Sequence, residues 1–112
     1  MPRKYTFFVH MNATKNWLSL SREERNSYFS ESIGEIFSRY PSVTVRLYDA
    51  EAFTTKCSDI AVYETENIQD YYFLVEELRD SKIFTEPYFE IVDIFPAIED
   101  GFVEFESKAS CN

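Results

Sequence analysis

The segment Tyr5-Thr6-Phe7-Phe8-Val9-His10-Met11 constrains the fold of this chain most strongly, because nearly all of its side chains are apolar. A short β-branched and aromatic run that ends in a polar cluster, here residues 12–16, is typical of a strand. A strand with one solvated face alternates apolar and polar residues, whereas this segment does not alternate. The sequence therefore predicts a strand inside a sheet that is covered on both faces.

A capping box predicts the start of the first helix, since Ser21 and Glu24 stand at the spacing at which each side chain bonds the other's backbone amide. The helix is expected to end at Pro41, and its buried stripe recurs at helical spacing. The stripe consists of Phe29, Ile33, Ile36, Phe37 and Tyr40. Asn67 caps a second predicted helix, whose inward stripe is Ile68, Tyr71, Tyr72, Val75 and Leu78.

Three further strands are predicted at residues 43–48, 57–64 and 87–95, and Pro96 is expected to close the last one. The resulting order, β-α-β-β-α-β, is the ferredoxin-like arrangement, in which two helices cover one face of a four-stranded antiparallel sheet. The other face would be too apolar to remain in water. We therefore expect an α+β fold of the dimeric α+β barrel type, with two sheets packed face to face in a homodimer.

Length and charge narrow the possible classes of function. The 112 residues fit one domain, 1–112, with a core at about 4–96 and an acidic C-terminal segment at 97–112. The net charge of −9 argues against nucleic acid and membrane partners. With no long apolar run, and with Cys57 and Cys111 poorly placed for a disulfide, the cytoplasm is the expected compartment.

The chain resembles the darcynin family along almost its whole length. The resemblance rests on segments that include Leu20-Ser21-Arg22-Glu23-Glu24-Arg25, Val45-Arg46-Leu47-Tyr48-Asp49-Ala50-Glu51-Ala52-Phe53 and Cys57-Ser58-Asp59-Ile60-Ala61. It implies a small, mainly bacterial protein of the dimeric ferredoxin-like group, and it implies no activity. The motif Leu20-Ser21-x-Glu23-Glu24-Arg25 also looks like the start of small dimeric enzymes such as muconolactone isomerases, which is an analogy of fold.

Strand alternation predicts one polar group of side chains on the sheet. With a hairpin centred near residues 52–53, Arg46 faces Asp59 and Tyr48 lies on the same side. Tyr63 shares the face of Asp59, and Glu90 and the single histidine, His10, complete the candidate pocket. The competing interpretation is a structural Arg46–Asp59 pair. Asp49 and Glu51 add two loop carboxylates, which are read either as acid–base groups or as a solvated turn.

No sequence motif identifies a reaction, a cofactor or a metal. One histidine and two distant cysteines cannot form a zinc site, and two glycines cannot form a phosphate-binding loop. The first hypothesis is a homodimer that binds a small molecule in an aromatic-lined pocket on the sheet, with Arg46 holding an acidic or carbonyl group. The alternatives are a cofactor-independent isomerase or monooxygenase that uses the same pocket, and a purely structural or protein-interaction dimer.

Overall fold

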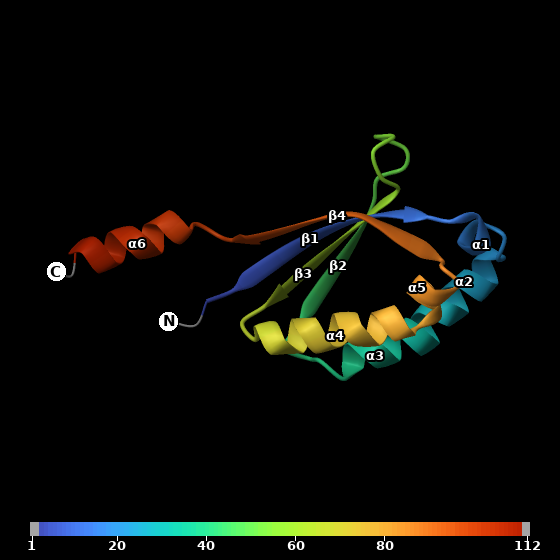
Figure 1. Ribbon diagram of the computed structural model, residues 1–112, viewed down its shortest axis with the longest axis horizontal. Coiled ribbons are helices and arrows are strands. Elements are labelled where there is room, and N and C mark those ends of the chain that lie inside the picture. The colour runs from blue at the N-terminus through green and yellow to red at the C-terminus, as the bar shows by residue number, and fades with distance from the viewer. Residues whose placement is uncertain (1–2, 111–112) are drawn as a thin grey trace.

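The computed structural model describes residues 3–110, and its elements follow the predicted order with three short helices added (Figure 1). The strands are β1 (Tyr5–Ala13), β2 (Thr44–Asp49), β3 (Asp59–Thr65) and β4 (Phe89–Ile98). The helices are α1 (Lys15–Leu18), α2 (Arg22–Tyr28), the π-helical turn η1 (Phe29–Ile33), α3 (Gly34–Ser38), α4 (Ile68–Asp80), α5 (Lys82–Thr85) and α6 (Gly101–Ser110).

The strands form one antiparallel sheet in the order β2-β3-β1-β4. The predicted capping box opens α2: the Glu24 amide donates to the Ser21 hydroxyl at 3.0 Å, and the Ser21 amide donates to the Glu24 carboxylate at 2.9 Å. The cap of α4 is also confirmed, because the Asp70 amide donates to the Asn67 side chain.

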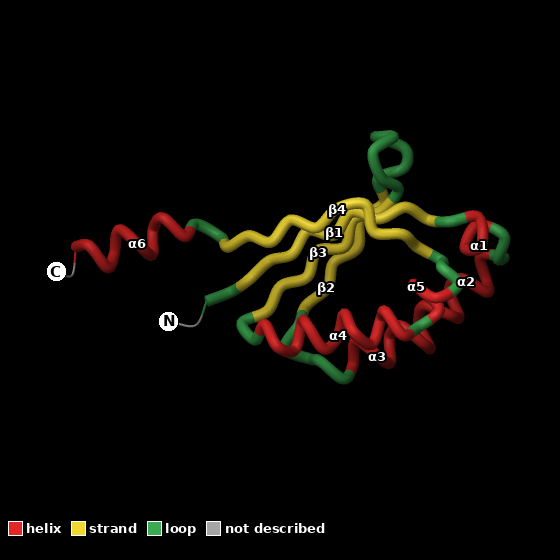
Figure 2. The backbone as a smooth tube through the Cα atoms, viewed as in Figure 1, coloured by secondary structure: helices red, strands yellow, loops and turns green. Residues whose placement is uncertain are grey.

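All helices except α6 lie on one side of the sheet, which leaves the opposite face open (Figure 2). The core lies between the two layers and includes Phe7, Val9, Ile33, Ala61 and Leu74. Phe7 of β1 stacks on Tyr71 of α4, with ring centroids 3.7 Å apart. Within residues 3–110, no helix combines the length and the apolar character that crossing a membrane requires.

The predicted stripe of the second helix is partly wrong. Leu74 has no exposed surface and Leu78 is buried, whereas Ile68 and Tyr72 are more than half exposed. The predicted stripe leaves out Leu74 and includes these two exposed residues. Instead the buried face is centred on Leu74, so that Tyr71, Leu74, Val75 and Leu78 pack inward.

The predicted end of the last strand is also wrong, because β4 runs through Pro96 to Ile98. A proline lacks an N–H group and interrupts an interior strand, but an edge strand tolerates it. β4 is such an edge, since it pairs only with β1, where Pro96 lies opposite Phe7. Of the two cysteines, Cys57 is buried and free, and Cys111 lies outside the described residues.

Candidate functional site

A cavity of about 330 Å³ lies between the sheet and the helix layer. This interlayer cavity is at the lower end of the size range of small-molecule pockets. Its walls are mostly apolar and come from both layers. The apolar residues that line it include Trp17, Phe29, Ile33, Leu78, Phe84 and Phe89.

Polar groups of both signs lie along this cavity. Arg22, Arg25 and Asn26 approach it from α2, and Asp49 and Asp59 approach it from the ends of β2 and β3. The Arg25 Nε donates to the Leu20 carbonyl at 3.2 Å. Neither arginine forms an ion pair within residues 3–110. The cavity therefore offers guanidinium groups on the helix side and carboxylates on the sheet side.

Tyr63 is the buried polar residue of the cavity wall. The residue is 6% exposed, and its hydroxyl has no hydrogen-bond partner among the described residues. Burial raises the pKa of Tyr63, so that the group stays a neutral hydroxyl at physiological pH. The Tyr63 hydroxyl keeps some contact with solvent, because among the described residues the Tyr28 hydroxyl is the side-chain polar atom that is both fully buried and unpartnered. A ligand in the cavity could form a hydrogen bond with the Tyr63 hydroxyl.

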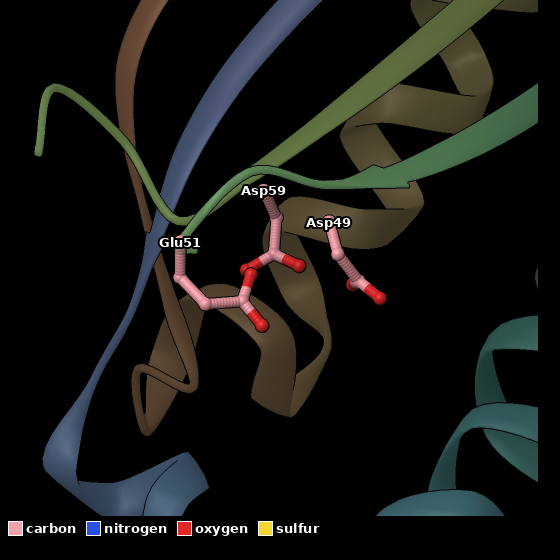
Figure 3. A group of neighbouring side chains, drawn as sticks. All are labelled: Asp49, Glu51 and Asp59. Atoms are coloured by element: carbon pink, nitrogen blue, oxygen red, sulfur yellow. The ribbon is translucent and has the colours of Figure 1, made fainter. Parts of the chain in front are cut away.

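Three carboxylates meet at the ends of β2 and β3 (Figure 3). One carboxylate oxygen from each of Asp49, Glu51 and Asp59 lies within 4.8 Å of the other two, so this group could hold a hard cation. Asp59 is half-buried and accepts a hydrogen bond from the Ser58 hydroxyl at 2.6 Å. Burial raises the pKa of the Asp59 carboxyl, the Ser58 hydrogen bond opposes this, and Glu51 and Asp49 raise it further.

The raised pKa of Asp59 predicts the effect of an Asp59→Asn substitution on stability. Folding is favoured by protonated Asp59, so this contribution is lost as the pH rises from the unfolded value of 3.8 through the raised folded pKa. We expect Asp59→Asn to raise the melting temperature at pH 7 and to change it little below pH 4. Circular dichroism melts at both pH values test this, with Glu31→Gln on the exposed face of η1 as the control. An equal melting temperature for parent and variant at pH 7 would contradict it.

The predicted Arg46–Asp59 pairing is wrong. Arg46 lies opposite Val62 and Tyr48 lies opposite Ile60, whereas Asp59 lies opposite Asp49. The hairpin is centred one to two residues later than predicted, so that Arg46 pairs three residues further along β3 than expected. Because side chains alternate between the two faces of a strand, a shift by an odd number of residues places Arg46 and Asp59 on opposite faces. Arg46 thus lies on the open face, and Asp59 and Tyr63 lie on the helix face.

Four of the six predicted pocket residues line two separate concavities, and the other two line neither. Arg46 and Tyr48 line an open-face groove, together with Phe8, Ile60 and Val62. Asp59 and Tyr63 line the interlayer cavity, which Tyr48 also borders. His10 lies on the open face, where its ring meets Phe95 edge to face at 5.2 Å. Glu90 is exposed on β4 opposite Asn12, and neither His10 nor Glu90 lines either concavity.

Sequence analysis missed the polar residues that α2 places along the interlayer cavity. Arg22, Arg25 and Asn26 continue the stripe of Phe29 and Ile33 toward the N-terminus at helical spacing. Polar residues at positions that face a sheet are typical of a site rather than of a core. Extending the stripe by two turns would have revealed them.

Comparisons with known proteins agree with this fold. A family model described as "Darcynin, domain of unknown function" matches residues 2–110. Darcynin 1 of Acinetobacter baumannii is 57% identical over 90 residues, which are 80% of this chain and 100% of the relative. The darcynin of Chromobacterium violaceum is 53% identical over 73 residues, which are 65% of this chain and 92% of the relative.

Two solved structures resemble the whole sheet and its helices. A mutant chlorite dismutase from Candidatus Nitrospira defluvii matches 96% of this chain with a TM-score of 0.77 and 22% identity. A heme-binding protein from Thermus thermophilus matches 96% with a TM-score of 0.77 and 20% identity. This chain spans less than half of either protein, 45% and 44%. The likeness confirms the predicted fold class, a ferredoxin-like α+β fold of the dimeric α+β barrel type.

Proposed function

We propose that this chain, which belongs to the darcynin family, binds a small organic molecule in the interlayer cavity. The observation that carries the proposal is the unpartnered hydroxyl of Tyr63 in the wall of an apolar cavity. Pockets for small molecules combine a mainly apolar lining with a few placed polar groups. The ligand would have an apolar body, held by side chains such as Phe29 and Phe89, and a polar group that bonds Tyr63.

The location differs from the pocket predicted on the open sheet face. The open-face groove contains Arg46, as the hypothesis required, but it lies on a surface that the fold type covers with another subunit. The interlayer cavity is formed entirely by one chain, and Arg25 rather than Arg46 is the half-buried cation beside it. We therefore assign the acidic or carbonyl group of the ligand to the side of α2.

A histidine-ligated heme does not fit the cavity. Histidine is the usual proximal ligand in globins and peroxidases, and one of the similar structures is described as heme-binding. In this chain His10 is the single histidine, and it lies on the opposite face of the sheet from the cavity. The proposed ligand is therefore not a heme of this type.

A cofactor-independent proton transfer in the same cavity is the second candidate. The observation that favours it is the raised pKa of Asp59, which borders the cavity. A carboxyl group with a raised pKa is suited to general acid or base catalysis near neutral pH. In this case Asp59 exchanges a proton with a ligand whose apolar body is held by side chains such as Phe29 and Phe89.

The Tyr63→Phe substitution tests the binding proposal, because it keeps the ring and removes only the hydroxyl. The single tryptophan, Trp17, lines the cavity and provides the signal. Small aromatic acids and amides are screened by Trp17 fluorescence, and native mass spectrometry of the purified protein detects any ligand that co-purifies. We expect Tyr63→Phe to weaken a bound probe about tenfold, as the loss of one hydrogen bond predicts.

The control for this test is Tyr72→Phe, since Tyr72 is an exposed tyrosine on α4. It should bind each probe as the parent does. A probe that binds parent and Tyr63→Phe equally would place the ligand elsewhere. A parent protein that neither changes Trp17 fluorescence with any probe nor carries a ligand would refute the proposal.

We also propose that the chain forms a homodimer through the open sheet face. This face carries Phe8 and Phe95, paired in register on β1 and β4, together with Val62 and Ile60 of β3. Phe8 is 39% and Phe95 is 47% exposed. The exposure of these two aromatic side chains supports the proposal, because a large apolar surface on one sheet face marks an interaction site.

A further inference from the structure

The chain exposes more surface than a compact protein of its mass. Its accessible surface is 7907 Å², whereas a compact monomer of 13.3 kDa exposes about 6,500 Å². The radius of gyration is 16.5 Å, compared with about 13 Å for a compact chain of this length. The excess of roughly 1,400 Å² exceeds the approximately 800 Å² that each partner buries in a standard interface.

Much of this extension comes from residues 97–110, the end of β4 and α6, which we call the C-terminal arm. The arm projects from one end of the sheet, away from the other helices (Figure 1). No other helix or strand in the described part of the chain packs extensively on α6. An ion pair joins its Glu104 to Arg3 at 3.0 Å, but both side chains are about half exposed.

The arm carries apolar side chains that its own chain does not cover. Phe102 is 64%, Val103 is 48% and Phe105 is 71% exposed. Phe102 and Phe105 are three residues apart, so they lie on one face of α6. A surface helix of this kind normally packs its apolar stripe on another element.

The turn that joins β4 to α6 has a specific geometry. Asp100 has a φ of 47°, in the left-handed region that aspartate tolerates better than most residues. A Cβ atom on Gly101 would lie 2.6 Å from the end of the Ile98 side chain, so a larger residue at this position would force that side chain to shift. Aspartate and glycine therefore suit the two positions of this turn.

We infer that the C-terminal arm packs on a second copy of this chain, with Phe102 and Phe105 buried against it. The inference rests on the proposed homodimer and identifies the C-terminal arm as a second segment that contacts the other copy. Ala97, Ile98 and Glu99, at the base of the arm, line the open-face groove. A copy that covers this groove must therefore contact the base of the arm, and α6 continues outward from that contact.

Area and charge favour a second copy of this chain as the occupant. A copy that covered the open face alone would leave the exposed apolar side chains of α6 in water. Arg46 is exposed on the groove and has no ion pair within residues 3–110. In a twofold dimer, Glu99 and Asp100 at the base of each arm can lie near Arg46 of the other copy, and the symmetry produces this contact twice.

The test compares the full-length parent with the double variant Phe102→Ser/Phe105→Ser by sedimentation velocity over a range of concentrations. We expect a dimeric parent and at least a tenfold higher dimer dissociation constant for the variant. Circular dichroism should show an unchanged fold, because α6 lies outside the core. The matched control is Phe53→Ser/Phe73→Ser, which removes two exposed phenylalanines from the β2–β3 loop and α4. It should dimerise as the parent does.

The outcomes separate the arm from the dimer itself. A dimeric parent with a double variant of equal affinity would overturn the inference and leave the homodimer standing. Equal weakening by the arm variant and by the Phe53/Phe73 control would also overturn it, because the effect would not be specific to the arm. A monomeric parent at all concentrations would overturn both proposals.

Discussion

Replacing Leu74 with alanine is expected to lower the free energy of unfolding by about 3 kcal/mol, since large-to-small substitutions in a core cost about 2–5 kcal/mol. Leu74 has no exposed surface, and it lies on α4 within the cluster that includes Ile33 and Ala61. In a domain of this size, a loss of that magnitude removes much of the total stability. Urea unfolding followed by circular dichroism measures it.

The control lies on the same helix. Ile68 is 52% exposed, and Ile68→Ala should cost less than about 1 kcal/mol. The two variants also separate the observed packing from the stripe that the sequence predicts, in which Ile68 faces inward. Similar losses for both would mean that α4 packs in another orientation.

Replacing Phe8 with glutamate is expected to weaken the proposed homodimer strongly while leaving the subunit folded. Phe8 lies on the open face beside Phe95 and Val62. A dimer would bury the new carboxylate against the apolar side chains of this face, a change that costs several kcal/mol. We expect the dimer dissociation constant to rise at least 100-fold, which corresponds to about 2.7 kcal/mol. Light scattering combined with size-exclusion chromatography measures it.

Leu18→Glu is the matched control, because Leu18 is 58% exposed on α1, which lies on the helix side of the sheet. It introduces the same charge away from the open face and should leave the dimer intact. A Phe8→Glu protein that still dimerises with the parent's affinity would exclude the open face as the interface.

Most of the fold could be predicted because local signals agreed with one another. The capping box at Ser21, the cap at Asn67 and the four apolar segments each fix an element, and their order fixes the topology. The largely apolar character of residues 5–11 correctly predicted a central strand. It did not show that half of this surface, on the open face, stays uncovered within one chain.

The candidate site was harder to predict because it depends on register. The β2–β3 loop contains no tight-turn signal that fixes its centre, so Arg46 was paired with Asp59 although it lies opposite Val62. Strand alternation predicts that Tyr63 belongs to a pocket. The cavity that Tyr63 lines, however, depends on the distance between the sheet and the helix layer, and the periodicity of the sequence carries no information about that distance. The sequence did not predict Arg22 and Arg25 as site residues, because arginines on a helix are usually exposed to solvent.

The position of Pro96 also protects the protein against the wrong kind of association. Sheets with an unpaired edge can add strands from other molecules and grow into fibrils. β4 is such an edge, but at Pro96 its backbone has no N–H group to offer an incoming strand, and an irregularity interrupts its pairing with β1 near His10 and Met11. Growth by strand addition at this edge is thereby disfavoured, whereas the proposed contact through the face of the sheet closes with two copies.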